Sequence, residues 1–231
     1  MARGSHSARL FHGARPMPCK IRSGVSYCVI DRQCYFIDLD RDRYFTLGPE
    51  LGARLATLTN SEPQPAISEL TCDLERLDLT EPADAWETIG PFTHIRPSGV
   101  ADRTRPPWQL LVGTCLTYFF VARRLRKLKL TGSAALLGKV RASGEVARRR
   151  RSLGELASAV TRAKQLIGEH DRCLPWSIAT GLLLLRHGFA ADVILGVSAN
   201  PFTAHCWTQY GDVIVGDDLD RVRSFTPIAA L

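Results

Sequence analysis

The sequence of 231 residues lacks a hydrophobic run long enough to cross a membrane as a helix. Its longest apolar run, Leu110 to Ala122, has thirteen residues, whereas a spanning helix needs about 20. We therefore predict no transmembrane segment and interpret this run as a buried helix. Residues 1–16 carry basic side chains but no apolar stretch of the kind found in secretory signals. We expect a cytoplasmic protein with reduced thiols.

Common motifs for metals and nucleotides are also missing. The seven cysteines form no CxxC pair, which is the spacing that zinc and redox sites use, so we expect no metal. There is no GxxxxGK[ST] loop, so no cofactor site is recognisable. The net charge of +7 would suit nucleic acid, an acidic membrane surface or an acidic peptide. The basic run Arg148 to Arg151 has no interleaved aromatic residues, so we do not expect nucleic acid as the partner.

The first third of the chain has the pattern of a small α+β unit. The segments YCVID, CYFID and RYFTL alternate apolar and polar residues between polar turns, which predicts a three-stranded antiparallel sheet over residues 25–47. Helical patterns follow over 49–58 and 65–77. The segment IRPSGVADRTRPP lacks periodicity and predicts a linker at 95–107. We expect one domain at 1–94 and a second at 108–231.

The second domain begins with helical patterns at about 108–130, 133–150 and 154–169. The stretch RCLPWSIATGLLLLRHGF then predicts a buried helix. Pro175 is tolerated only in a first turn, so the helix starts close to Cys173. Free N–H groups and the helix dipole favour a thiolate at that position. The alternative is that Cys173 is an inert core residue.

The segments after this helix predict a strand, ADVILGVS, and then a hairpin of AHCWTQ and VIVGD. A three-residue loop, Tyr210 to Asp212, would place Gln209 opposite Val213 and His205 opposite Asp217. A two-residue loop would instead pair His205 with Asp218. We prefer Asp217. A thiol, an imidazole and a carboxylate in this order are the groups of a Cys-His-Asp nucleophilic site.

The same residues carry a family resemblance. RCLPWSIATGLLLLRHGF, ILGVSANPFTAHCW and the downstream Asp217 resemble the transglutaminase-like domain of lasso-peptide B proteins, the leader peptidases of lasso-peptide biosynthesis. The resemblance implies a papain-like cysteine protease with Cys173, His205 and Asp217 as its catalytic triad. It also implies a precursor (leader) peptide as substrate and an ATP-dependent lasso cyclase as partner, and it allows an ATP requirement whose site no motif locates.

The N-terminal unit resembles a PqqD-like recognition element through VSYCVIDRQCYFIDLDRDRYFTLGPELGARLATL. That resemblance implies a winged-helix-like fold in which the leader adds a strand beside the third strand of the sheet. Tyr44 and Phe45 are then candidate substrate contacts, although one of them must point into the small core. Trp207 shares the face of His205 and either lines the cleft or packs in the core. Two other functions remain open: acyl transfer to an amine, as in transglutaminases, and non-catalytic peptide carriage.

Overall fold

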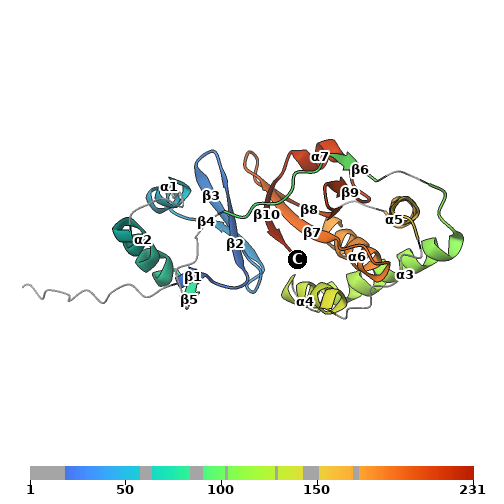
Figure 1. Cartoon of the computed structure of the whole chain (residues 1–231), viewed down its shortest axis with the longest axis horizontal. Helices are drawn as coiled ribbons and strands as arrows, with labels where there is room; N and C mark the ends of the chain where they lie inside the picture. The colour runs from blue at the N-terminus through green and yellow to red at the C-terminus, as the bar shows by residue number, and fades with distance from the viewer. Residues whose placement is uncertain are drawn as a thin grey trace, which may run out of the picture.

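The computed structural model describes residues 19–57, 64–83, 91–101, 104–127, 130–142, 151–168 and 172–231. Figure 1 shows a small blue sheet with its helices on one side of the molecule and a second, larger α+β unit on the other. The mixture of helices and strands confirms the predicted α+β class. Residues 148–150 of the basic run, and residues 84–90 and 102–103 near the expected linker, lie outside the described residues.

The N-terminal sheet has the three antiparallel strands that the alternation predicts. They are β2 (Val25–Ile30), β3 (Gln33–Asp38) and β4 (Arg43–Thr46), in the order β2-β3-β4. Two helices follow, α1 (Pro49–Thr57) and α2 (Gln64–Arg76), close to the predicted ranges. A short ladder of β1 (Cys19–Ile21) with β5 (Thr80–Pro82) ties the start of the unit to its end.

Both faces of this small sheet are covered, and the pleat decides which side chains lie on each face. Phe36 and Phe45 belong to the core under α1 and α2. Their neighbours Ile37 and Tyr44 pack in a different core, which is shared with the second unit. The second unit therefore packs on the face of the sheet opposite the helices, as Figure 1 also shows.

The second unit is built on the sheet order β10-β7-β8-β9-β6. Its strands are β7 (Asp192–Ser198), β8 (Thr203–Tyr210), β9 (Val213–Ile214) and β10 (Thr226–Ala230), with β6 (Gly99–Val100) at the edge. Its helices are α3 (Trp108–Leu125), α4 (Leu130–Ala142), α5 (Leu153–Ile167), α6 (Cys173–Arg186) and the short α7 (Leu219–Arg223).

Helix α6 is the central helix of this unit. It contacts α3, α4 and α5 as well as strands β7 and β8, and every residue from Trp176 to Leu184 is buried. Helix α3, in contrast, is buried on only one face, which includes Leu110, Tyr118 and Val121. Leu116 and Phe119 are exposed, so the prediction of a buried helix over 110–122 is correct for one face and wrong for the other.

The segment expected to be a linker is partly built into the second sheet. Strand β6 pairs in parallel with β9, and the N–H of Ala101 donates to the carbonyl of Ile214. Gln209 and Arg223 donate to the carbonyls of Ile95 and Pro97. The part of the expected linker at 95–101 is thus bound to the open edge of the second sheet.

The two units share a hydrophobic core. Cys28 and Ile37 from the first unit are buried in the same cluster as Val197 and Ile228 from the second, and β10 lies against β2 and β3. At the edge of this contact, the Phe202 ring stacks on Tyr35, with ring centroids 6.0 Å apart. This apolar contact fixes where the small sheet lies relative to α6.

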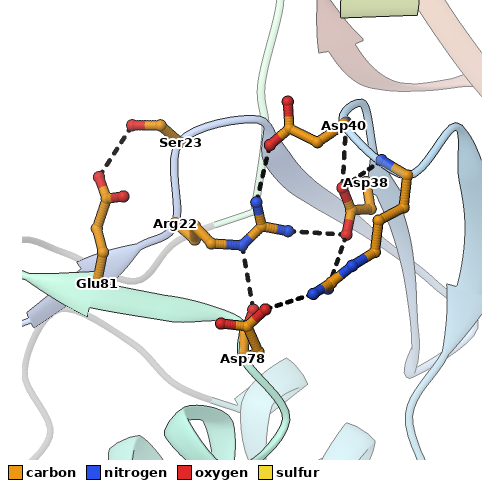
Figure 2. Close-up of polar contacts among 7 residues, drawn as sticks. Arg22, Ser23, Asp38, Asp40, Asp78 and Glu81 are labelled. Carbon is orange, nitrogen blue, oxygen red and sulfur yellow. Dashed lines mark hydrogen bonds and ion pairs between the residues drawn. The ribbon is translucent and has the colours of Figure 1, made fainter. Parts of the chain in front are cut away.

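The first unit contains a buried carboxylate with several partners, that of Asp38. Figure 2 shows Arg22 beside Asp38, and Arg22 Nη2 donates to Asp38 Oδ2 at 2.8 Å. Arg41 Nη1 donates to the same oxygen at 3.2 Å. The backbone N–H groups of Asp40 and Arg41 donate to the other carboxylate oxygen. The Asp38 side chain is 0% exposed. Burial raises its pKa, but these hydrogen bonds and charges outweigh burial and lower it.

We predict that Asp38→Asn lowers the free energy of unfolding by about 2 kcal/mol, because asparagine keeps acceptors for the backbone but leaves two arginines without their buried charge. Asp40→Asn is the matched control, since Asp40 pairs with the same Arg22 but is half exposed, and we expect it to cost less than about 1 kcal/mol. Urea unfolding at neutral pH, followed by circular dichroism, measures both. Equal losses of unfolding free energy in the two variants would show that the burial of Asp38 contributes nothing to stability.

Candidate active site

Cys173 is the first residue of α6, as the position of Pro175 in the first turn predicts. The preceding Arg172 makes no side-chain hydrogen bond to the helix start, so the first N–H groups of the helix have no side-chain cap from it. The backbone N–H groups of Cys206 and Leu174 donate to the thiol. A sulfur in this environment is stabilised as an anion by N–H donors and by the helix dipole.

His205 on β8 lies between this thiol and a carboxylate. Its Nε2 is 2.9 Å from Asp217 Oδ2, and its ring also forms a side-chain hydrogen bond with Cys173. Because Nε2 is occupied by the carboxylate, Nδ1 is the ring nitrogen left for the thiol. His205 is 3% exposed, so its charged form depends on these partners rather than on water.

The hairpin register differs from the one that was used to choose Asp217. Tyr210 pairs with Val213 and Gln209 with Ile214, so the loop is the two-residue Gly211-Asp212, and the predicted three-residue loop is wrong. Strand β9 ends at Ile214, and the left-handed Gly216 (φ +74°) turns the chain. This turn, rather than cross-strand pairing, brings Asp217 to His205.

Asp218, the other candidate, has a different task. Its Oδ1 accepts a hydrogen bond of 2.9 Å from the backbone N–H of Arg221 and caps the start of α7. A side chain held as an N-cap points along its own helix. The two adjacent aspartates thus have different partners: Asp217 contacts the His205 imidazole, and Asp218 caps helix α7.

Ser177 joins α6 to β8 one turn after the thiol. Its hydroxyl donates to the Cys206 carbonyl at 2.7 Å, and the hydroxyl of Thr208 donates to the Ser177 carbonyl at 2.8 Å. All of these groups are buried. The pair of bonds fixes the helix that carries the thiol against the strand that carries the imidazole.

Lys164 on α5 is a site residue that sequence reasoning missed. Its ammonium group donates to the Gly216 carbonyl at 2.6 Å, directly before Asp217, and its charge lowers the pKa of that carboxyl. The only sequence signal is a lysine among buried alanine and valine positions of an amphipathic helix. Lys164 therefore positions the turn that carries the carboxylate.

Trp207 is buried beside His205 rather than exposed to a substrate. It is 1% exposed and packs with Ile194 and Ile214. Gly196, opposite His205 in the β7–β8 ladder, makes room for it, because a Cβ there would lie 2.6 Å from Trp207 Cζ3. The prediction that Trp207 binds substrate is not supported; it holds the strand behind the imidazole.

The charges of the three side chains depend on one another. Burial raises the pKa of the Cys173 thiol, but the hydrogen bond and charge of His205 outweigh burial, so the pKa is lowered. Burial lowers the pKa of His205, but Asp217 and Cys173 outweigh it, and the pKa is raised. Burial raises the pKa of Asp217, but the hydrogen bond and charge of His205, the charge of Lys164 and the backbone N–H of Asp218 together outweigh burial and lower it. The geometry therefore favours a thiolate beside an imidazolium.

The two candidate leader contacts lie on opposite faces of the small sheet. Phe45 stacks on Phe36, with centroids 5.1 Å apart, so it belongs to the core of the first unit. Tyr44 packs in the core cluster that also includes Cys173 and meets the Phe202 ring edge-on. Of Tyr44 and Phe45, only Tyr44 lies on the face of the sheet that packs in the same cluster as Cys173.

Among the described residues, no group of three or more histidine, cysteine, aspartate and glutamate side chains could hold a metal ion. In the same part of the chain, no helix is both long enough and apolar enough to span a membrane.

Comparison with known proteins gives one match. The sequence profile of the transglutaminase-like superfamily matches residues 115–230, which is half of the chain and includes Cys173, His205 and Asp217. No curated protein and no solved structure matches the sequence or the fold. The matched range runs from within α3 to the last residue of β10 and thus contains the elements that form the candidate site. The chain belongs to the transglutaminase-like superfamily.

Proposed function

We propose that the protein is a cysteine endopeptidase that removes the leader from a ribosomally made lasso-peptide precursor before macrolactam formation. The observation that carries the proposal is the contact of one imidazole with both Cys173 and Asp217. The lasso-peptide assignment comes from the resemblance of RCLPWSIATGLLLLRHGF and PFTAHCW to leader peptidases of that pathway. The superfamily match supports the coarser assignment to a cysteine peptidase or acyltransferase fold.

The chemistry follows from the positions of the three groups. The Cys173 thiolate attacks the carbonyl carbon at the leader-core junction, and the electron pair of the carbonyl moves to its oxygen. The His205 imidazolium gives its proton to the leaving amine as the C–N bond breaks. Water then attacks the thioester with His205 as base, which releases the leader acid and the thiol. Asp217 holds the imidazole and stabilises its charge.

The N-terminal unit is proposed to hold the leader. Strand β4 is at the edge of its sheet, since the strand order is β2-β3-β4, and an edge strand can pair with an extended peptide. Tyr44 on this strand packs in the same cluster as Cys173. A leader paired with β4 would therefore lie near the thiol, and tethering would raise its local concentration. A PqqD-like, winged-helix-like fold for this unit and a separate ATP-dependent cyclase as partner belong to the same proposal.

Mass spectrometry of the cognate precursor peptide tests the activity. We expect the wild type to cut one bond and Cys173→Ala to lose at least about 1,000-fold in rate, since the nucleophile is removed. The reactions are run with and without ATP and the partner cyclase. Equal cleavage by Cys173→Ala would remove this thiol from the mechanism. With an added amine, a product heavier by the amine less water would show acyl transfer instead of hydrolysis.

The pH dependence of thiol alkylation tests the triad. The groups around the thiol are His205, Cys206 and Tyr44, and those around the imidazole include Asp217 and Arg221. Because the pKa of Cys173 is lowered, its reaction with iodoacetamide should reach half its maximum below the ordinary thiol range of about 8.5. Asp217→Asn should move this midpoint upward by about one pH unit, because the imidazolium loses its counter-charge.

Asp218→Asn is the matched control for this measurement, since asparagine also caps helices and Asp218 caps α7. Its midpoint should equal that of the wild type. The exposed Cys72 also reacts, so Cys173→Ala supplies the background rate. A profile that shifts equally in both aspartate variants would contradict the assignment of Asp217.

A further inference from the structure

The N-terminal sheet supplies a side chain to the neighbourhood of the thiol. Tyr44 comes from β4 of the first unit, whereas Cys173 begins α6 of the second. Both pack against the core cluster that joins the two units. The contact between the Tyr44 and Phe202 rings, with centroids 5.8 Å apart, holds the phenol at the turn just before β8, the strand that carries His205.

The hydroxyl of Tyr44 has a proton to donate. Among the described residues, none accepts a hydrogen bond from it. Burial raises the pKa of this phenol, and the nearby Cys206 and Cys173 raise it further. The group therefore remains an O–H donor at neutral pH. A half-buried donor that packs in the same core cluster as the nucleophile is available to the substrate.

The proposed reaction needs such a donor. Attack by the thiolate puts a negative charge on the carbonyl oxygen of the substrate, and donors placed around that oxygen lower the barrier. The nearest glutamine before Cys173, Gln165, lies on α5 with its side chain exposed, so it does not act as this donor. The N–H groups at the start of α6 supply part of this role, because Arg172 does not cap them.

We propose that Tyr44 completes the oxyanion site by donating its hydroxyl to the carbonyl oxygen of the acyl group attached to Cys173. This inference rests on the proposed thiol chemistry and extends it across the two units. The recognition sheet then contributes to the reaction itself, and not only to holding the peptide. The active site is incomplete without the first unit.

Tyr35 provides a matched control. It lies on the neighbouring strand β3 and stacks on the same Phe202 ring. Its hydroxyl, however, donates to Gln33 Oε1 at 3.4 Å. Tyr35→Phe and Tyr44→Phe therefore each remove one oxygen from the same face of the sheet. Both rings pack against the cluster that includes Cys173, and the thiol raises the pKa of the Tyr44 phenol.

Two small reagents separate the roles of the thiol and of the oxyanion donor. p-Nitrophenyl acetate acylates the thiolate through a tetrahedral oxyanion and releases p-nitrophenolate. Iodoacetamide alkylates the same thiolate at a saturated carbon, where no oxyanion forms. Neither reagent needs leader recognition. The rate of each is measured for the wild type, Tyr44→Phe and Tyr35→Phe, after subtraction of the rate of Cys173→Ala.

We expect Tyr44→Phe to slow acylation by about 10- to 100-fold while its alkylation rate stays within about twofold of the wild type. Tyr35→Phe should change neither rate. Equal slowing of both reactions by Tyr44→Phe would mean that the phenol acts on the thiolate, and no slowing would mean that it does not act; either result overturns the inference. If the wild type reacts no faster than Cys173→Ala with both reagents, the proposed nucleophile fails, and the inference fails with it.

Discussion

The burial of helix α6 is the constraint on which the second unit depends. A helix whose residues from Trp176 to Leu184 are all buried must satisfy its polar groups without water. Ser177 and Thr180 do so within the protein: Ser177 donates to the Cys206 carbonyl and Thr180 to the Trp176 carbonyl. The Ser177 bond, together with the bond from the Thr208 hydroxyl to the Ser177 carbonyl, also fixes the helix start against β8. The packing of α6 against β8 therefore places the thiol beside the imidazole.

The second constraint is the pleat of the small sheet. Adjacent residues on a strand point to opposite faces, so β3 and β4 supply Phe36 and Phe45 to one core and Ile37 and Tyr44 to another. A sheet that is buried on both faces cannot turn freely on a linker, and the residues 95–101 are themselves bound to the second sheet. The two units therefore meet through a packed interface, which gives strand β4 a fixed place relative to the thiol.

Much of the local structure could be predicted from periodicity and special residues. The three strands of residues 25–47 follow from their alternation, and the start of α6 follows from Pro175. The hairpin was harder, because Gly211-Asp212 and Tyr210-Gly211-Asp212 are both acceptable loops. Asp217 meets His205 although the assumed loop is wrong, since the register ends at Ile214 and Gly216 redirects the chain. Short strands with a following turn cannot be aligned by counting residues.

The sequence by itself determined most of the helices and strands, the candidate thiol and imidazole, two adjacent aspartates as candidate carboxylates, and the alternation that separates Tyr44 from Phe45. These depend on local sterics, hydrogen bonding and period, which are properties of neighbouring residues. Only the tertiary structure decided that Trp207 is buried, that Lys164 supports the turn before Asp217, and that Tyr44 packs with Cys173. Each of these joins residues from elements far apart in the chain, and their contacts arise from burying apolar faces together, which no local pattern specifies.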